Sequence, residues 1–184
     1  MTNMQTDFGI GAQSRPVVFL LLGPGRSGKD TAAAELHRLS QLPRGSTSAC
    51  FCNEVLHALR DDIAKRLGPN WRIVLGEWMA SYMLSDGSGN RLYREMFKDG
   101  CRIFTGIRRL TELWEFWTWL EGRANVIVWW VDASRRDLPP DLSMKLDKRT
   151  LRALGVPYTV IDNNAGVEEL KAEVQRAWKE FQAQ

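Results

Sequence analysis

The 184-residue chain has few of the residues that build metal centres or disulfide frameworks. It contains three cysteines, at positions 50, 52 and 101, with no C-x-x-C pair, and only two histidines. An odd number of cysteines and so few imidazole groups give no support to a zinc site or a disulfide scaffold. We expect the three cysteines to be core thiols, and His37 and His57 to be isolated surface or packing residues.

Long hydrophobic runs are also missing. The longest uninterrupted apolar run, 17–22, is far shorter than the ~20 residues of a membrane-spanning helix, so it predicts a buried strand and no membrane partner. The segment 1–14 has neither the basic stretch nor the apolar block of a signal peptide. We therefore expect a cytoplasmic protein, in the cytoplasm of the host cell if it is encoded by a phage.

The sequence has no large excess of positive or negative charge. The formal net charge is +3 and the isoelectric point about 8.9, which argues against a dedicated duplex-DNA binder with a basic stripe. Of the 25 basic residues, however, 18 are arginine. Arginine binds phosphate and carboxylate through a planar pair of donors, so this bias indicates either an anionic ligand or a surface rich in solvated arginine.

Apolar segments of strand length alternate with helical patterns along the chain. A length of 184 residues and 44% hydrophobic positions suit one globular domain with one core. We expect strands at 17–22, 46–53, 101–105, 126–131 and 158–162, and helices at 29–39, 54–67, 72–84, 91–98, 111–120, 144–154 and 167–181. This alternation predicts an α/β protein of three layers with a mostly parallel sheet. The predicted organisation is a flexible leader at 1–15 and a single domain at 16–184.

A glycine-rich turn connects the first expected strand to the first expected helix. It fits G-x-x-x-x-G-K, the pattern of a phosphate-binding loop, and reads Gly23-Pro24-Gly25-Arg26-Ser27-Gly28-Lys29. In such a loop the backbone N–H groups surround a phosphate chain, the helix N-terminus adds partial positive charge, and the lysine reaches the β- and γ-phosphates. The position of the motif between a strand and a helix therefore predicts nucleotide binding.

One position departs from the usual loop. The residue after Lys29, normally a serine or threonine that contacts Mg²⁺, is Asp30, and the hydroxyl follows at Thr31. A carboxylate here can bind Mg²⁺ directly or through water, or it can cap the helix. We favour the metal-linked role, with Asp30 and Thr31 as the candidate Mg²⁺ residues.

The loop, with two later segments, resembles the phage-type deoxynucleoside monophosphate kinases, whose loop commonly carries GKD. The stretch 105–112, TGIRRLTE, looks like the T-D-V-R-F-x-N-E element of that family. The stretch 160–170, VIDNNAGVEEL, looks like its closing V-I-x-N-N-G-x-x-E-x-L element. Looser similarity extends to animal-type phosphomevalonate kinase and dephospho-coenzyme A kinase.

The resemblance implies a P-loop kinase domain with a five-stranded parallel sheet of order 2-3-1-4-5 and helices on both faces. It further implies ATP in the phosphate loop with Mg²⁺, an acceptor-binding insertion at about 54–100 and a lid at about 133–144. Ligands of open α/β sheets lie at the carboxyl ends of the strands, which is where the three matching elements fall. The implied reaction is transfer of the γ-phosphoryl group of ATP to a (deoxy)nucleoside monophosphate.

Site roles follow from the same resemblance. Arg108 corresponds to the arginine that grips the acceptor phosphate, and Arg109 either assists it or points to solvent. Arg135 and Arg136 fall where such kinases carry lid arginines, so Lys29 and these arginines form the predicted catalytic set. The expected adenine contacts are Asn163, Asn164 and Gly166. The remaining residues expected to bind ATP and its Mg²⁺ are those of the loop and the start of the helix, namely Gly23, Gly25, Arg26, Ser27, Gly28, Lys29, Asp30 and Thr31.

Two departures from the family pattern affect the acceptor. Gly106 replaces the family's aspartate, and the lid region lacks a His-x-Ser-Glu pattern, reading DLSM at 141–144. Two alternatives therefore stay open, namely a kinase that acts on a hydroxymethylated base within DNA and a non-catalytic nucleotide-binding module. A homodimer is also open.

Seven of the eight tryptophans lie between positions 71 and 130. We expect four of them to pack in the core: Trp114, Trp117, Trp129 and Trp130. Trp71 and Trp78 fall in the predicted insertion, where a tryptophan either stacks on a base or packs. The insertion also carries Arg72, Arg91 and Arg94, which are further candidates for the acceptor phosphate or simple surface charges.

Overall fold

A five-stranded parallel sheet of order β2-β3-β1-β4-β5 forms the middle of the molecule. The computed structural model describes residues 15–138, 141 and 144–184, so the predicted leader lies almost entirely outside the described residues. The strands are β1 (Val17–Leu22), β2 (Arg44–Ser46), β3 (Ile103–Thr105), β4 (Asn125–Asp132) and β5 (Thr159–Asp162). The strand order and the parallel pairing confirm the predicted fold class.

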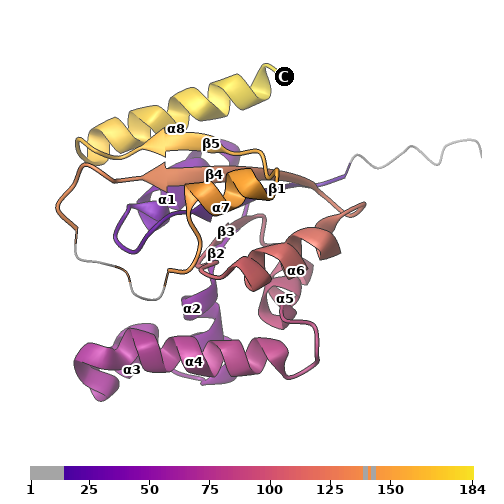
Figure 1. Ribbon diagram of the computed structural model, residues 1–184, viewed down its shortest axis with the longest axis vertical. Helices are drawn as coiled ribbons and strands as arrows, with labels where there is room; N and C mark the ends of the chain where they lie inside the picture. The colour runs from indigo at the N-terminus through magenta and orange to yellow at the C-terminus, as the bar shows by residue number, and fades with distance from the viewer. Residues whose placement is uncertain (1–14, 139–140, 142–143) are drawn as a thin grey trace, which may run out of the picture.

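The helices cover both faces of the sheet (Figure 1). They are α1 (Lys29–Ser40), α2 (Thr47–Cys50), α3 (Arg60–Leu67), α4 (Trp71–Leu84), α5 (Arg91–Lys98), α6 (Leu110–Leu120), α7 (Lys148–Ala153) and α8 (Val167–Gln182), with a π-helical turn at Phe51–Val55 and a 3₁₀ turn at Gly68–Asn70. Figure 1 shows α8 and the α3–α4 pair at opposite ends of the molecule. None of the helices in the described ranges is long and apolar enough to cross a membrane.

Alternating side chains of β1 divide the core into two halves. Phe19 and Leu21 pack with α1 and α8, whereas Val18, Leu20 and Leu22 pack on the other face with α4 to α7. Both faces are buried because a parallel strand at the centre of a sheet has helices above and below it. β1 is therefore fixed at the middle of the fold, and the loop that follows it lies at the middle of the sheet's carboxyl edge.

The tryptophan predictions are confirmed in part. Trp129 and Trp130 are buried on opposite faces of the sheet, and Trp117 is partly buried. Trp114 was wrongly predicted to lie in the core, because its side chain is 51% exposed. The helix that carries it presents Leu113, Phe116 and Leu120 to the sheet instead.

The expected strand at 46–53 is the main error of the secondary-structure prediction. β2 occupies only Arg44–Ser46, and the apolar residues that follow form α2 and the π-helical turn. A short apolar run is compatible with either a buried strand or a buried helix. Phe51 and Cys52 are buried against the helices of this side of the sheet, so tertiary packing decides for the helix.

Two helix predictions were too long. The helix expected at 54–67 begins only at Arg60, after His57 adopts a positive φ of 50°, and Leu59 of the predicted apolar face is 65% exposed. The helix expected at 144–154 begins at Lys148, where the Asp147 carboxylate accepts a hydrogen bond from the Thr150 N–H at 2.7 Å and caps it.

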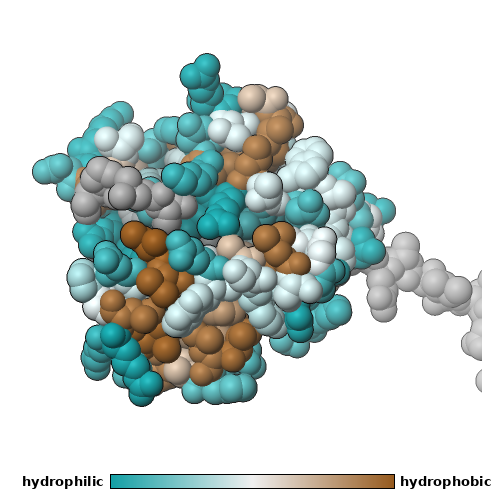
Figure 2. Space-filling model, turned by 60° about the horizontal axis from the view of Figure 1, so that its bottom comes forward, coloured by the Kyte–Doolittle hydropathy of each residue, from teal (hydrophilic) through white to brown (hydrophobic). Residues whose placement is uncertain are grey.

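Apolar side chains gather on the face formed around α3 and α4 (Figure 2). The large apolar residues exposed in this part of the chain are Leu59, Ile73, Trp78 and Leu84. This apolar surface therefore belongs to the predicted insertion.

Glu35 links the two helices that cover one face of the sheet. Its buried carboxylate accepts hydrogen bonds from Arg38 Nη2 at 2.6 Å and Nε at 2.9 Å, both within α1, and from Gln175 Nε2 of α8 at 2.8 Å. Mainly because of the hydrogen bonds from Arg38, the pKa of Glu35 falls from 4.5 to about 2.

We predict that Glu35→Gln lowers the Tm by about 2–4 °C at neutral pH. The ionised carboxylate stabilises the native state fully above its unfolded pKa of 4.5, and this stabilisation is lost as the pH falls toward about 2. The difference in Tm from wild type should therefore shrink across that window. The control is Glu180→Gln, since Glu180 of α8 is exposed and pairs only on the surface; equal destabilisation by both variants would contradict the role of Glu35.

Candidate active site

The glycine-rich loop runs from the end of β1 to the first residue of α1 at the carboxyl edge of the sheet. Gly28 has φ +93°, and a Cβ there would overlap the Nδ2 atom of Asn163. Ser27 is fully buried, and its N–H donates to the Pro24 carbonyl at 3.2 Å. The loop is thus a tight turn that only glycine permits at position 28, and the N-terminus of α1 follows it directly.

Asn163 holds this loop from behind. Its side chain is buried, and Nδ2 donates to the Ser27 carbonyl at 2.7 Å. Asn163 was expected to contact adenine, but its side chain faces the loop. Asn164, Ala165 and Gly166 remain partly or fully exposed after it, so these three residues are the ones available to a base.

Lys29 is folded back onto its own loop. Nζ donates to the carbonyl oxygens of Gly23 at 2.6 Å and Pro24 at 2.5 Å. Burial, followed by the positive charge of Arg108, lowers the pKa of Lys29 from 10.5 to about 8. A negatively charged ligand in the loop would raise the pKa of Lys29 again and oppose both effects, because it stabilises the protonated amine.

Asp30 lies in the first turn of α1 beside the end of β3. The hydroxyl of Thr105 donates to Asp30 Oδ1 at 3.1 Å. The residue at the helix N-cap is Gly28, with no side-chain cap, so the capping alternative for Asp30 does not apply. Thr31 is half-buried and lines the same cavity as Asp30.

Arg108 and the glycine-rich loop share one negatively charged partner. The Asp141 oxygen Oδ2 accepts a hydrogen bond from the backbone N–H of Gly25 at 2.6 Å and from Arg108 Nη1 at 2.7 Å. Residues far apart in the sequence thus converge on a single carboxylate oxygen. No sequence pattern assigned a role to Asp141, since its place beside the loop depends on the fold.

Gly106, which begins the turn after β3, leaves no room for a side chain. It has φ +107°, and a Cβ there would overlap Oγ1 of the buried Thr47. The aspartate that the family pattern carries at this position therefore does not fit this chain, and Asp30 is the carboxylate that the loop region provides instead.

Glu112, another residue without a predicted role, shapes the same turn. Its largely buried Oε2 accepts hydrogen bonds from the N–H groups of Arg108 at 2.9 Å and Arg109 at 3.2 Å, and from the Tyr93 hydroxyl at 3.3 Å. Glu112 thus fixes the backbone that carries both arginines. A glutamate three residues after the N-cap is one half of a capping box, but the N-cap here is Arg109 and not serine or threonine, so the sequence carried only part of that signal.

A cavity of about 630 Å³ lies between the glycine-rich loop, the start of α2, the α3–α4 pair and the turn after β3. Its seven basic residues outnumber its four carboxylates, Asp30, Asp61, Glu77 and Glu112. The basic residues are Arg26, Lys29, Arg60, Arg72, Arg108, Arg109 and Lys145. This excess of positive charge favours an anionic ligand.

Of the residues in the predicted insertion that were candidates for acceptor binding, only some line this cavity. Trp71 and Arg72 line it. Arg91 instead pairs with Glu95 at 2.9 Å, and Arg94 pairs with Asp86 and Ser88. These two arginines, like Trp78, lie outside the lining of the cavity, which leaves Trp71 and Arg72 as the candidates near the loop.

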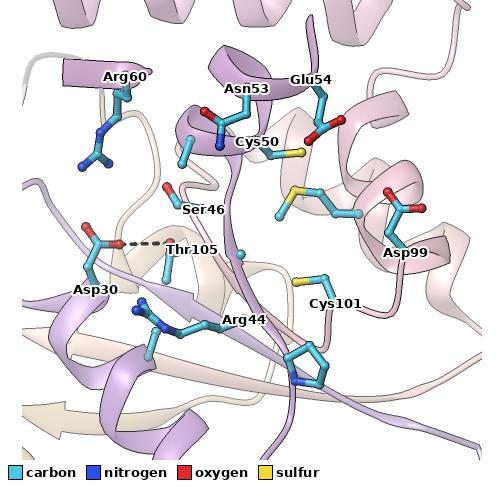
Figure 3. A pocket seen from close by; sticks show the side chains of 15 residues that line it. Asp30, Arg44, Ser46, Cys50, Asn53, Glu54, Arg60, Asp99, Cys101 and Thr105 are labelled. Atoms are coloured by element: carbon cyan, nitrogen blue, oxygen red, sulfur yellow. Dashed lines mark hydrogen bonds between the residues drawn. The ribbon is translucent and has the colours of Figure 1, made fainter. Parts of the chain in front are cut away.

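A second cavity of about 570 Å³ adjoins the first and shares four lining residues with it, Asp30, Ser46, Arg60 and Thr105. Figure 3 shows Arg44 and Arg60 on the same side of this cavity as Asp30. Asp30 therefore lies at the junction of two hollows.

Arg135 and Arg136 are both exposed and belong to the lining of neither cavity. The Arg135 N–H donates to Asn164 Oδ1 at 2.7 Å, which joins the segment after β4 to the one after β5. Residues 139–140 and 142–143 of the predicted lid lie outside the described residues. The structure thus groups Lys29, Asp30, Thr31 and Arg108 around one cavity, whereas Arg135 and Arg136 of the predicted lid lie outside its lining.

The residues that face the cavity fit a nucleotide with Mg²⁺. The Asp141 carboxylate already accepts hydrogen bonds from the Gly25 N–H and from Arg108, so these two donors can bind an anionic group. Within the described ranges, no group of three or more His, Cys, Asp or Glu side chains could hold a metal ion. A cation here would therefore take most of its ligands from phosphate and water, as Mg²⁺ commonly does.

Two solved structures share this fold at low sequence identity. A provisionally named kinase from Chloroflexus aurantiacus J-10-fl matches with a TM-score of 0.50 and 17% identity, over 93% of this chain and 98% of that one. Shikimate kinase from Bacteroides thetaiotaomicron matches with a TM-score of 0.50 and 11% identity, over 90% of this chain and 98% of that one. No family model and no curated protein gives a significant match. The sheet order, the loop and these likenesses together define the P-loop fold.

The overlap at Gly106 gives a stability prediction. We expect Gly106→Ala to destabilise the protein through the positive φ, at about 1–2 kcal/mol, and through the contact with Thr47, at about 1–3 kcal/mol more. Gly100→Ala is the matched control, since Gly100 has φ +91° with nothing within 4 Å of a Cβ.

Urea unfolding of both variants measures the two free energies, and adding Thr47→Ala to Gly106→Ala should recover part of the larger loss. Equal losses for Gly100→Ala and Gly106→Ala would contradict the crowding by Thr47.

Proposed function

We propose that the protein is an ATP-dependent kinase that transfers the γ-phosphoryl group to a (deoxy)nucleoside monophosphate. The observation that carries this proposal is the single carboxylate oxygen of Asp141, bound at once by the Gly25 N–H and by Arg108. Phosphoryl transfer is catalysed mainly by positioning the two substrates and by positive groups that stabilise the charge between them, so donors for the nucleotide and for the acceptor have to lie close together. The loop and Arg108 meet in this way.

On the nucleotide side, the N–H groups of the loop and Lys29 would hold the β- and γ-phosphates. Asp30 and Thr31 would supply oxygen ligands to the Mg²⁺ shell, and the exposed segment at 164–166 would contact the base. Bound Mg²⁺ would neutralise charge on the phosphate oxygens. To bind the phosphates, Lys29 Nζ would leave the carbonyl oxygens of Gly23 and Pro24. The phosphate charge would keep the amine protonated.

On the acceptor side, the basic lining of the larger cavity supports a ligand with a phosphate group. Arg108 would bind that phosphate, with Arg72, Arg109 and Lys145 close along the same cavity. Trp71 offers an aromatic face that a base can stack on. Positive groups on both sides of the transferred group provide most of the catalysis in such reactions, since the protein contributes little covalent chemistry.

A hydroxyl acceptor is the second candidate, and Asp30 favours it. Asp30 lines both cavities and accepts a hydrogen bond from Thr105, and its carboxylate would act as the general base for an alcohol bound there. One of the two similar structures bears the name shikimate kinase, and shikimate is an alcohol that carries a carboxylate. A hydroxymethylated base in DNA belongs to the same chemical class of acceptor.

The proposal predicts ADP release from Mg-ATP when a nucleoside or deoxynucleoside monophosphate is present. We expect Lys29→Ala to reduce turnover about 10²–10³-fold, whereas Lys179→Ala, on the exposed face of α8, should leave it unchanged. The acceptor panel includes phosphomevalonate, shikimate and a hydroxymethylated oligonucleotide. Turnover only with a hydroxyl acceptor would select the second candidate, and ATP binding without turnover on any acceptor would indicate a non-catalytic nucleotide-binding module.

The lowered pKa of Lys29 predicts proton uptake on nucleotide binding. The free protein holds Lys29 at a pKa of about 8, and phosphates raise that pKa, so binding at pH 8 should take up about half a proton. Affinity should accordingly fall as the pH rises above about 8. Calorimetry in two buffers of different ionisation enthalpy measures the uptake, which should be absent near pH 6.5 and in Lys29→Met; the same uptake in Lys29→Met would contradict the assignment.

A further inference from the structure

The Asp141 carboxylate fills the mouth of the glycine-rich loop. Besides accepting hydrogen bonds from Gly25 and Arg108, its Oδ2 atom lies only 2.7 Å from where a Cβ on Gly25 would be. The side chain of Asp141 is 13% exposed, against 33% for Arg108. A phosphate oxygen therefore cannot bind the Gly25 N–H while this carboxylate is in place.

Backbone contacts connect Asp141 to the turn after β3, since the Met144 N–H donates to the Asp141 carbonyl at 3.0 Å. The Lys145 N–H donates to the Arg108 carbonyl at 2.8 Å, which ties this segment to the turn after β3. The negative charge of Asp141 thus lies between the Gly25 N–H and Arg108, two donors that suit a phosphate group. A permanent carboxylate there would oppose any phosphate ligand.

We propose that Asp141 is an internal competitor that, in the free protein, occupies the donors at Gly25 and Arg108 that would otherwise bind nucleotide phosphate and acceptor phosphate. The inference rests on the proposed function, and it concerns how ligands enter the same site. A nucleotide must displace Asp141 from Gly25, and an acceptor phosphate must displace it from Arg108. Binding and catalysis both require the carboxylate to withdraw.

One competitor shared by two ligands makes their binding cooperative. Each ligand alone binds weakly because only the fraction of molecules with Asp141 withdrawn accepts it. Once the first ligand has removed the carboxylate, the second binds at its full affinity. The factor by which removal of Asp141 raises the affinity for either ligand should therefore equal the factor by which, in the wild-type protein, one ligand raises the affinity for the other.

The test measures binding of the Mg²⁺ complex of adenylyl imidodiphosphate by calorimetry. We expect Asp141→Asn to bind this nucleotide more tightly than wild type, by about 5- to 150-fold. Asp141→Ala removes the occupant altogether and should bind at least as tightly, which keeps the test valid if the asparagine amide retains the contact. Asp137→Asn is the matched control, because Asp137 is an exposed aspartate of the same segment that lines neither cavity.

A second titration adds deoxythymidine monophosphate as the acceptor probe. In wild type, each ligand should tighten the other, and in Asp141→Asn this coupling should shrink by the factor gained for the nucleotide alone. If Asp141 acted only by charge repulsion from a fixed position, Asp141→Asn would raise both affinities and leave the coupling unchanged. If deoxythymidine monophosphate binds neither protein, the nucleotide titration with its Asp137 control decides.

Three results would overturn the inference. Equal nucleotide affinity in wild type and both Asp141 variants would show that the carboxylate does not compete. Equal tightening in Asp141→Asn and Asp137→Asn would show a general charge effect, as would unchanged coupling. Failure of every variant to bind the nucleotide would instead overturn the proposed function, and the inference with it.

Discussion

The position of β1 at the centre of a parallel sheet is the constraint on which the site depends. β1 pairs with β3 on one side and with β4 on the other, so the turns after these three strands end at one edge. The glycine-rich loop comes after β1, the Gly106–Arg109 turn after β3, and the segment that bears Asp141 after β4. Groups from positions 25, 108 and 141 can meet at one oxygen only because the strands deliver them to the same place.

Buried polar groups then fix each turn in its shape. Asn163 holds the loop through the Ser27 carbonyl, and Glu112 holds the backbone of Arg108 and Arg109. A buried carboxylate or amide that lost these partners would carry a substantial cost, so these hydrogen bonds hold the loop and the arginine turn in place against the sheet. Rigidity on both sides lets one negatively charged group bridge them.

The sequence predicted the parts of the fold that depend on local pattern. The apolar run at 17–22, the glycine motif after it and the regular alternation of segments were sufficient for the fold class, and the resemblance supplied the strand order. The strand predicted at 46–53 was wrong, because a short apolar run can form either a strand or a helix and tertiary contacts here favour the helix. The prediction of a buried Trp114 was wrong, because α6 packs Leu113 and Phe116 against the sheet and leaves Trp114 exposed.

The site was predictable where a residue acts through its own type and spacing, as Lys29 and Arg108 do. It was not predictable where a residue acts through distant partners. Asn163 matched a family element, yet its role is to hold the loop, and the crowding of Gly106 by Thr47 depends on two segments about 60 residues apart. Asp141 lies 116 residues from Gly25, and no local pattern connects them.

The most direct test of nucleotide binding at this loop is a crystal structure with Mg²⁺ and adenylyl imidodiphosphate. We predict the triphosphate analogue along the loop, a phosphate oxygen on the Gly25 N–H, Lys29 Nζ turned from the Gly23 and Pro24 carbonyls to the phosphates, and Asp141 withdrawn. A nucleotide bound elsewhere, with Asp141 still on Gly25 and Lys29 still on its own loop, would contradict the proposed site.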